Sequence, residues 1–347
     1  MNVTRRDFLK ASAAITSALA LKASGLAQLQ KAMAAGAEAA GVPVIWLQGQ
    51  SCTGCSVSLL NTIHYMTIDD LLLNTLDLQY HPTVMAAAGD LAVGAAMGAD
   101  PGYVLIIEGS IPVGNQGHYC HVWEDENDNP VTMETAFDVF WRNAGYILAV
   151  GTCASYGGIP AGNPNPTTAL GVNGALSYFG VSKKKRPTVI NIPGCPAHPD
   201  WIVGTVAALL AVLAGEGEMP ELDRDGRPIE FFGEHVHYHC PNRGGGNKAK
   251  VLGDPGCLVG LGCNGQQTHA DCPMRKWNAG EPGEGKGVNW CVGAGNPCQG
   301  CTEPDFPDGM SPFYELGHKK MRNMEISTRL RRRKRTRERR SSRIQKV

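Results

Sequence analysis

Short apolar runs recur between residues 42 and 200, and glycine or polar residues follow each of them. The runs are rich in β-branched residues and are continuous rather than alternating, as is typical of parallel strands buried on both faces. A fifth strand is expected near Leu76–Tyr80, beside four clear runs at residues 42–47, 103–107, 146–150 and 188–192. Segments of helix length separate them, with candidate helices at 55–64, 132–142 and 199–214. The pattern predicts an α/β fold with a doubly wound parallel sheet.

The pattern changes near Met219. Residues 230–315 hold seven cysteines and glycine-dense loops such as Gly244–Gly246, with little periodicity. Such a segment folds around covalent or metal staples rather than around a large apolar core. We therefore expect a sheet domain over 42–218, an irregular domain over 219–315 and a basic tail over 316–347.

Charge is distributed unevenly, although the formal net charge is zero. Residues 329–347 carry eleven Lys or Arg and one Glu, which leaves 21 basic and 31 acidic residues in 1–328. An acidic body argues against nucleic-acid binding. A like-charge tail is expected to be disordered, and its cations suit an anionic membrane surface or an acidic redox partner.

The N-terminus has the features of an export signal. Arg5 and Arg6 stand in Thr-Arg-Arg-Asp-Phe-Leu-Lys, followed by an Ala-rich stretch and small residues near Ala32–Ala35. This twin-arginine pattern predicts that residues 1–35 are a signal peptide for the periplasm. The alternative is an ordinary basic amphipathic helix. The sequence contains no later run of about 18 apolar residues, so no transmembrane helix is expected after processing.

Twelve cysteines in an exported chain first suggest disulfides. The twin-arginine route, however, carries proteins that have already folded in a reducing cytoplasm, commonly with a cofactor in place. Metal ligation is therefore favoured over disulfides.

Four cysteines follow predicted strands directly: Cys52 and Cys55 the first strand, Cys153 a later one and Cys195 the last. Ligands of open α/β sheets gather beyond the carboxyl ends of the strands. Four thiolates at one edge suit a 4Fe–4S cluster. The alternatives are two disulfides or zinc. Zinc sites usually pair two Cys-x-x-Cys knuckles, and the sheet domain has one.

The second domain supplies further potential ligands. Seven cysteines and one histidine make eight, which is enough for two more clusters. His237 stands three residues before Cys240, but His235 and His239 flank it, so spacing leaves the choice of histidine open. Cys120 is left over and is expected to be a buried free thiol.

Several motifs resemble the small subunit of nickel–iron hydrogenases, and the similarity covers roughly residues 1–315. Asn289-Trp-Cys291-Val resembles the periplasmic nickel–iron–selenium branch in particular. The others are Cys52-Thr-Gly-Cys55-Ser, Glu108-Gly-Ser-Ile-Pro112, Gly151-Thr-Cys153-Ala-Ser, Pro193-Gly-Cys195-Pro, His237-x-x-Cys240, Gly262-Cys263-Asn-Gly and Cys298-x-x-Cys301.

The resemblance implies a flavodoxin-like sheet domain, an irregular iron–sulfur domain and three 4Fe–4S clusters. It selects His237 among the three histidines. The implied ligand sets are a proximal set (Cys52, Cys55, Cys153, Cys195), a distal set (His237, Cys240, Cys257, Cys263) and a medial set (Cys272, Cys291, Cys298, Cys301).

The resemblance also implies a heterodimeric oxidoreductase acting on H2, with the nickel–iron site in a separate large subunit. No catalytic residue is then expected in this chain. Its implied role is to carry electrons between that site (H2 = 2 H+ + 2 e−) and an external partner, a periplasmic cytochrome or a membrane redox protein.

The medial set departs from the typical family pattern. Typical members have three cysteines, a 3Fe–4S cluster and a proline at the position of Cys291. A fourth thiolate predicts 4Fe–4S here. The alternative is that Cys291 is a bystander beside a 3Fe–4S cluster.

Other departures lie around the proximal set. Gly54 and Gly158 occupy the places where oxygen-tolerant members carry two extra cysteines. The acidic residue that usually precedes the first ligand is missing from Gln50-Ser51.

Three alternatives differ in function. A large subunit has a histidine shortly after each Cys-x-x-Cys, whereas Ser56 and Thr302 follow here. A subunit related to respiratory NADH dehydrogenase needs a proximal-type cluster but not eight further ligands. An exported binding protein needs disulfides and no metal.

Overall fold

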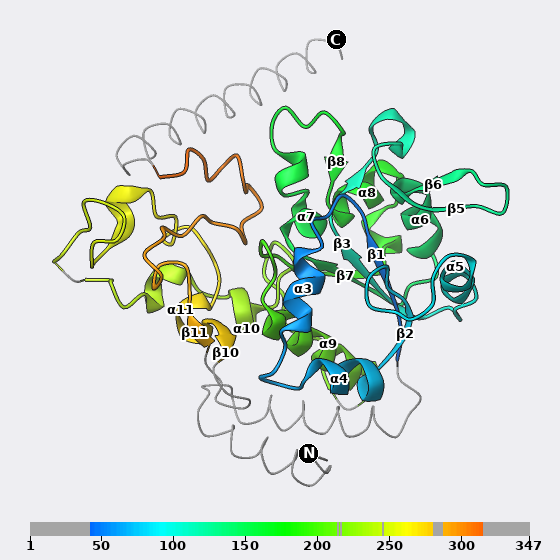
Figure 1. Cartoon of the computed structure of the whole chain (residues 1–347), viewed down its shortest axis with the longest axis horizontal. Helices are drawn as coiled ribbons and strands as arrows, with labels where there is room; N and C mark the ends of the chain where they lie inside the picture. The colour runs from blue at the N-terminus through cyan, green and yellow to red at the C-terminus, as the bar shows by residue number, and fades with distance from the viewer. Residues whose placement is uncertain (1–41, 214, 216, 245, 280–286, 315–347) are drawn as a thin grey trace, which may run out of the picture.

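The computed structural model describes residues 42–213, 215, 217–244, 246–279 and 287–314. The expected signal peptide and the basic tail lie outside the described residues. Figure 1 shows a central sheet flanked by helices, with the yellow and orange second domain to one side. Of the helices in the described part of the chain, none has the length and apolarity to cross a bilayer.

Five parallel strands form the central sheet in the order β2-β1-β3-β7-β9. All five predicted strands are confirmed. The order, with the second strand outside the first, is that of flavodoxin-like sheets. The strands are β1 (Val42–Gln48), β2 (Leu76–Tyr80), β3 (Val104–Glu108), β7 (Tyr146–Val150) and β9 (Thr188–Ile192).

Both faces of this sheet are buried, which explains the continuous apolar runs. Along β1, Val44 and Trp46 belong to one core, and Ile45 and Leu47 to the other. Full burial of one large apolar side chain contributes about 1.5–3 kcal/mol. The first core is covered by α3 (Gly54–Leu60) and α9 (Pro199–Leu213), and the second by α5 (Asp90–Met97), α6 (Met133–Phe140) and α8 (Val172–Tyr178).

The predicted helices are present, but two of them are shorter than expected. The Thr132 side chain caps α6 by accepting from the Thr135 backbone N–H at 3.1 Å. Helix α3 ends at Leu60 because Asn61 closes it: its Nδ2 donates to the Val57 carbonyl at 2.7 Å. Helices end where such bonds satisfy the last carbonyls.

The remaining elements are short. In the sheet domain they are α4 (Ile68–Asp70), η1 (Leu71–Thr75), η2 (Gly114–Gly117), α7 (Thr152–Tyr156), η3 (Ile159–Ala161), η4 (Lys183–Lys185) and two ribbons, β4 (Ile111–Pro112) with β8 (Ala169–Leu170) and β5 (His121–Glu124) with β6 (Pro130–Thr132). In the second domain they are α10 (Ile229–Phe232), η5 (Val236–His239), η6 (Leu258–Leu261), α11 (Cys272–Arg275) and the ribbon of β10 (Trp277–Ala279) with β11 (Gly287–Asn289).

The second domain packs on the α9 side of the sheet. Leu258 and Trp290 belong to the same core as Trp201 of α9. Arg275 is buried and bonds both Asp200 of α9, at 3.0 Å, and Asp271, at 2.7 Å. The two domains therefore share one apolar core and a buried ion-pair network.

Candidate functional site

The positions of the four sheet-domain cysteines follow from the topology. β1 leads into Cys52 and Cys55, β7 into Cys153, and β9 into Cys195. Because β1, β3, β7 and β9 are parallel neighbours, their carboxyl ends lie along one edge of the sheet. The prediction that these cysteines follow strand ends is confirmed.

The four thiols of the proximal set lie close enough to repel one another as thiolates. Burial, together with the charges of Cys195 and Cys52, raises the pKa of Cys153 to about 12. Burial also raises the pKa of Cys55 well above its usual value, with further increases from Glu108, Cys153 and Cys195. Neighbouring thiolates that repel one another favour a cationic centre between them. A bound metal ion compensates their charges and deprotonates the thiols outright.

Glycines keep space clear around these sulfurs. A Cβ on Gly151, whose φ is +85°, would lie 2.5 Å from the Cys55 Sγ. One on Gly158 would lie 2.9 Å from the Cys153 Sγ, and one on Gly54 would lie 3.0 Å from the Cys52 Sγ. The backbone thus approaches the thiols as closely as it can, and the space and donor set fit an iron–sulfur cluster.

Glu108 ends β3, between β1 and β7, and is 1% exposed. The sequence motif contained this residue but gave it no role. The one feature that could have indicated a role is a single acidic residue at the end of an apolar strand. Its carboxylate accepts six hydrogen bonds. The donors are the Ser56 hydroxyl and, at 2.9–3.3 Å, Trp46 Nε1, Gln48 Nε2, Ser51 Oγ and the backbone N–H groups of Cys55 and Ser56.

The Glu108 carboxylate therefore anchors the turn that carries Cys52 and Cys55. Ser51, which stands where an acidic residue is usual, donates to Glu108, and its Oγ also accepts from the Thr53 backbone N–H at 2.9 Å. Hydrogen bonds to charged groups contribute about 1.5–3 kcal/mol each. This network holds the turn of Cys52 and Cys55 through contacts within the protein.

The medial set also gathers. Burial raises the pKa of Cys272 well above its usual value, and the thiolates of Cys301, Cys298 and Cys291 all raise it further, as does Asp271. Cys291 is therefore within electrostatic reach of Cys272, although its side chain is exposed in this chain.

The distal set lies on loops. Burial raises the pKa of Cys263, and the charges of Cys240 and Cys257 raise it further. The His237 backbone N–H donates to the Gly265 carbonyl at 2.9 Å. A Cβ on Gly265 would lie 3.6 Å from the Cys263 Sγ and 3.8 Å from the His237 nitrogen, so His237 and Cys263 adjoin the same glycine.

The two neighbouring histidines have other contacts. His239 bonds the Glu234 carboxylate. His235 stacks on His269, with ring centroids 4.0 Å apart, and its backbone pairs with that residue. Neither contact involves the distal cysteines.

The sets are also linked to one another. Burial, together with the thiolates of Cys291 and Cys195, raises the pKa of Cys301 to about 12. Burial likewise raises the pKa of Cys298, and the first charge to add to it is that of Cys263. The medial set thus adjoins the proximal set through Cys195 and the distal set through Cys263.

All twelve cysteines are free. Cys120 is half-buried rather than fully buried, and burial raises its pKa. Across the described ranges, no group of three or more His, Cys, Asp or Glu side chains surrounds a single metal ion.

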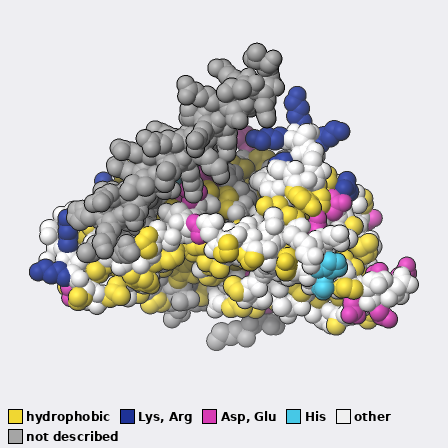
Figure 2. All heavy atoms as spheres, turned by 90° about the horizontal axis from the view of Figure 1, so that it is seen from above, with side chains coloured by type: hydrophobic (Ala, Val, Ile, Leu, Met, Phe, Trp, Pro, Cys, Tyr) yellow, Lys and Arg dark blue, Asp and Glu magenta, His cyan; other side chains and the backbone are white. Residues whose placement is uncertain are grey.

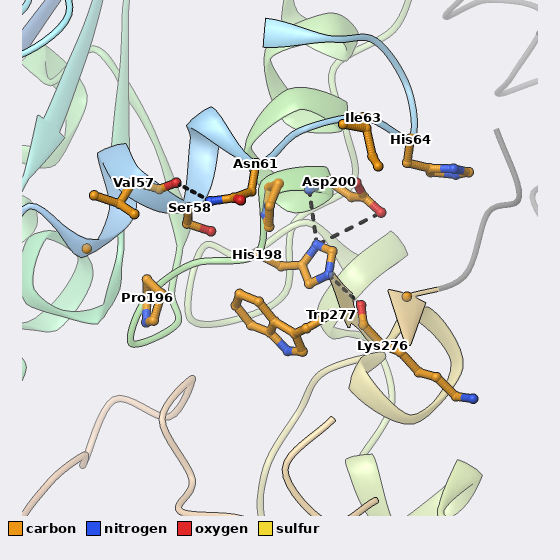
Figure 3. A pocket seen from close by; sticks show the side chains of 13 residues that line it. Val57, Ser58, Asn61, Ile63, His64, Pro196, His198, Asp200, Lys276 and Trp277 are labelled. Carbon is orange, nitrogen blue, oxygen red and sulfur yellow. Dashed lines mark hydrogen bonds and ion pairs between the residues drawn. The ribbon is translucent and has the colours of Figure 1, made fainter. Parts of the chain in front are cut away.

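A pocket of about 300 Å³ opens beside the proximal set (Figure 3). Gly54 and Pro196, which are next to proximal cysteines, form part of its wall, as do Lys276 and Trp277 of the second domain. His198 joins the two sides: its Nε2 lies 2.6 Å from the Lys276 carbonyl, and its Nδ1 accepts from the Asp200 N–H. The pocket therefore lies where both domains meet the proximal set.

Comparison with known proteins gives two matching family models. One, described as the NADH ubiquinone oxidoreductase 20 kDa subunit, matches residues 52–209, and the other, the C-terminal region of the NiFe/NiFeSe hydrogenase small subunit, matches 232–314. The periplasmic [NiFeSe] hydrogenase small subunit of Desulfomicrobium baculatum is 41% identical over 327 residues, which cover 90% of this chain and 99% of that protein. The chain belongs to the nickel–iron hydrogenase small-subunit family.

Other hydrogenase small subunits agree with this assignment. The periplasmic [NiFe] hydrogenase small subunit 1 of Nitratidesulfovibrio vulgaris is 37% identical, covering 90% of this chain and 93% of its own. The structure of the recombinant [NiFeSe] hydrogenase from Desulfovibrio vulgaris Hildenborough superposes with a TM-score of 0.73 and 45% identity, over 80% of this chain and 99% of the other. A nickel–iron hydrogenase small subunit, rather than a subunit of NADH dehydrogenase, also accounts for the cysteine-rich segment 232–314.

Proposed function

We propose that this protein transfers electrons between the nickel–iron site of a large subunit, where H2 is split, and an external redox partner, with three 4Fe–4S clusters as its cofactors. The clusters, when bound, supply one-electron redox chemistry. The proximal, medial and distal sets defined above are the proposed ligands, twelve residues in all. No residue of this chain is proposed to act on H2 itself.

The observation that carries this proposal is the spatial order of the three sets. Thiol groups of the medial set are electrostatically coupled to Cys195 on one side and to Cys263 on the other. A continuous row of ligand sets is the arrangement that stepwise electron transfer requires. Disulfide or isolated zinc sites would have no need of it.

Two details of the ligand sets follow. The coupling of Cys291 to Cys272 supports a fourth medial thiolate and hence a 4Fe–4S medial cluster. The contacts of His235 and His239 with other residues support His237 as the distal ligand.

The partner and the location are proposed on similar grounds. The pocket beside the proximal set, walled by both domains, lies on the face where we place the large subunit. Two relatives are named periplasmic, and Arg5-Arg6 matches the twin-arginine signal, so we propose export of the folded heterodimer by that route.

Metal analysis and electron paramagnetic resonance of the purified heterodimer test the proposal. We expect about twelve iron atoms per chain, from three clusters of four, and no near-stoichiometric 3Fe–4S signal in the oxidised protein. A colourless protein with all its thiols oxidised would contradict the proposal, as would zinc in place of iron.

Electron exit is tested separately. His237→Ala should leave hydrogen–deuterium exchange at the large subunit intact but slow the reduction of external acceptors, because the histidine lies in the distal set. An equal loss of both activities would place His237 elsewhere.

A further inference from the structure

The loop that follows Cys240 differs in charge from the rest of the molecule. Residues 241–253, which we call the distal loop, contain Arg243, Lys248 and Lys250 and no acidic residue, whereas residues 1–328 as a whole carry an excess of ten negative charges. The three cations are exposed. In the described part of the chain none of them forms an ion pair with a carboxylate. The Asp254 carboxylate, just after the loop, accepts from the backbone N–H groups of Lys250 and Val251 at 3.0 and 3.2 Å. Three cations beside this one acid leave the surface with an excess of positive charge.

Backbone pairing holds the two lysines outward beside a distal ligand. Lys248 forms a parallel bridge with Cys257, and the Cys257 N–H donates to the Asn247 carbonyl at 2.9 Å. The extended alternation makes Ala249 buried at 5% exposure, while Lys248 and Lys250 on either side are exposed. The lysines are thus fixed to the outside of the distal set.

Apolar side chains stand exposed among these cations. Tyr238, the residue after His237, is 53% exposed, and Val251 and Leu252 are 61% and 56% exposed. The Arg243 guanidinium lies over the Tyr238 ring, 5.0 Å from its centroid, and also donates to the Tyr238 carbonyl at 3.2 Å. The surface therefore has exposed apolar groups among cations, as in an interface with a polar rim.

The β5–β6 ribbon at the opposite end of the molecule is acidic. Figure 2 shows Lys and Arg side chains at the left end, which the distal loop forms in Figure 1, and others at the upper right, whereas Asp and Glu side chains gather at the lower right, over the β5–β6 ribbon. That ribbon carries Glu124, Asp125, Glu126 and Asp128. A basic loop at one end and an acidic ribbon at the other help to orient an approaching charged molecule before contact.

We propose that the distal loop, together with Tyr238, is the docking surface for an acidic redox protein. The proposal rests on the function proposed above, because it places the partner at the distal set. Complementary charge would steer the acidic protein to this end, and the exposed apolar groups would exclude water at the contact. Electron-transfer encounters bury less than about 1,200 Å², which suits a patch of this kind.

A binding and rate experiment on the complete heterodimer tests this. An acidic flavodoxin and a lysine-rich c-type cytochrome serve as acceptors, and both the dissociation constant and the rate of H2-driven reduction are measured across ionic strengths. At low salt we expect flavodoxin to bind more tightly than the cytochrome. Lys248→Glu/Lys250→Glu should weaken its binding and slow its reduction about tenfold or more at low salt, and the effect should shrink as salt screens the charges.

Lys184→Glu/Lys185→Glu on the exposed η4 turn is the matched control, with the same charge change away from the distal loop. It should leave flavodoxin binding within about twofold of wild type. Leu252→Ser should weaken flavodoxin binding at every salt concentration. The hydrogen–deuterium exchange activity of the large subunit, measured in each variant, should stay at the wild-type rate. An unchanged rate establishes that the heterodimer is intact.

Each other outcome overturns a distinct claim. Equal loss in both lysine pairs, or unchanged binding after Lys248→Glu/Lys250→Glu, would show that the distal loop is not the docking surface. If Lys248→Glu/Lys250→Glu lost binding to anionic lipid vesicles but kept binding to flavodoxin, the distal loop would be a membrane contact instead. If binding weakened as expected but reduction did not slow, the docking surface would stand and electron exit at the distal set would be wrong.

Discussion

The two domains present their cysteines in different ways. In the sheet domain, thiols follow strands that have their own hydrogen-bond ladder and two apolar cores. In the second domain they lie on loops, apart from Cys272 at the start of α11, and α10, η5, η6 and α11 have four residues each. The sheet therefore positions the cysteines of the proximal set, whereas those of the medial and distal sets lie on segments with little regular structure of their own.

With the proposed ligand sets, one chain would combine a preformed site with sites that depend on their cofactor. Glu108 and its donors fix the turn of Cys52 and Cys55 without metal. The distal set has fewer such supports: Cys257 is held chiefly by its bonds with Asn247 and Ala249. Metal-dependent segments of this kind fold when the metal binds.

Iron removal is expected to have the largest effect. Amides of residues 232–314 should lose most of their protection against hydrogen exchange, while those of β1, β3 and β7 should retain theirs, because only the former depend on cluster ligation. Hydrogen-exchange mass spectrometry of the chain before and after chelation measures this. Equal loss in both regions would show that the sheet depends on the clusters as well.

Glu108→Gln tests the preformed site. Replacing a buried carboxylate by an amide puts an NH2 group against donors, and a buried donor left without an acceptor costs about 1–3 kcal/mol. The free energy of unfolding, from denaturant titration of the sheet domain signal, should fall by that amount. Asp138→Asn, which removes the exposed pair with Arg142 on α6, should cost less than about 1 kcal/mol.

His81 makes the stability of the sheet domain depend on pH. It is buried at 1% exposure beside Ser56, and desolvation lowers its pKa to about 4, against an opposing effect of Glu108. The unfolded chain takes up this proton below about pH 6.5, and the folded chain resists it. Stability is therefore present at neutral pH and lost as pH falls from about 6.5 toward 4, by about 2 kcal/mol between pH 7 and 5.

His81→Asn removes the titrating ring and keeps an acceptor for the Thr83 N–H that now bonds His81 Nδ1 at 3.1 Å. Its unfolding free energy should vary less with pH than that of the wild type over this range. Identical slopes for the two proteins would assign the acid sensitivity to other groups.

Cys291→Pro should have the smallest effect on the structure and the clearest effect on the electron paramagnetic resonance spectrum. The variant leaves three medial thiolates, so the oxidised protein should gain a 3Fe–4S signal near one spin per chain and lose about one iron atom. Cys120→Ser, a thiol outside the three sets, is the control and should gain none. A three-iron signal of equal size in the wild type would make Cys291 a bystander.

The sequence predicted the sheet well because buried parallel strands leave an unambiguous pattern. Continuous β-branched runs such as 103–107 and 146–150 have few other structural interpretations. The gathering of Cys52, Cys55, Cys153 and Cys195 followed from the same topology, because parallel neighbours end at one edge.

Other features depended on contacts between distant segments. The role of Glu108 arises from donors on β1 and α3, which no local pattern around Glu108 indicates. Spacing left three candidate histidines, and the contacts of His235 with His269 and of His239 with Glu234 became visible only in three dimensions. The outward direction of Lys248 likewise depends on its pairing with Cys257.

The order of the ligand sets along the chain differs from their order in space. The ribosome makes the proximal ligands first, the distal ones next and Cys298 and Cys301 last, yet these last two adjoin Cys263 and Cys195, respectively. Translation proceeds from the N-terminus, so the central link forms only when synthesis is nearly complete. A chain truncated before Cys298 would lack that link, so completion of this one segment would distinguish a finished subunit from a fragment.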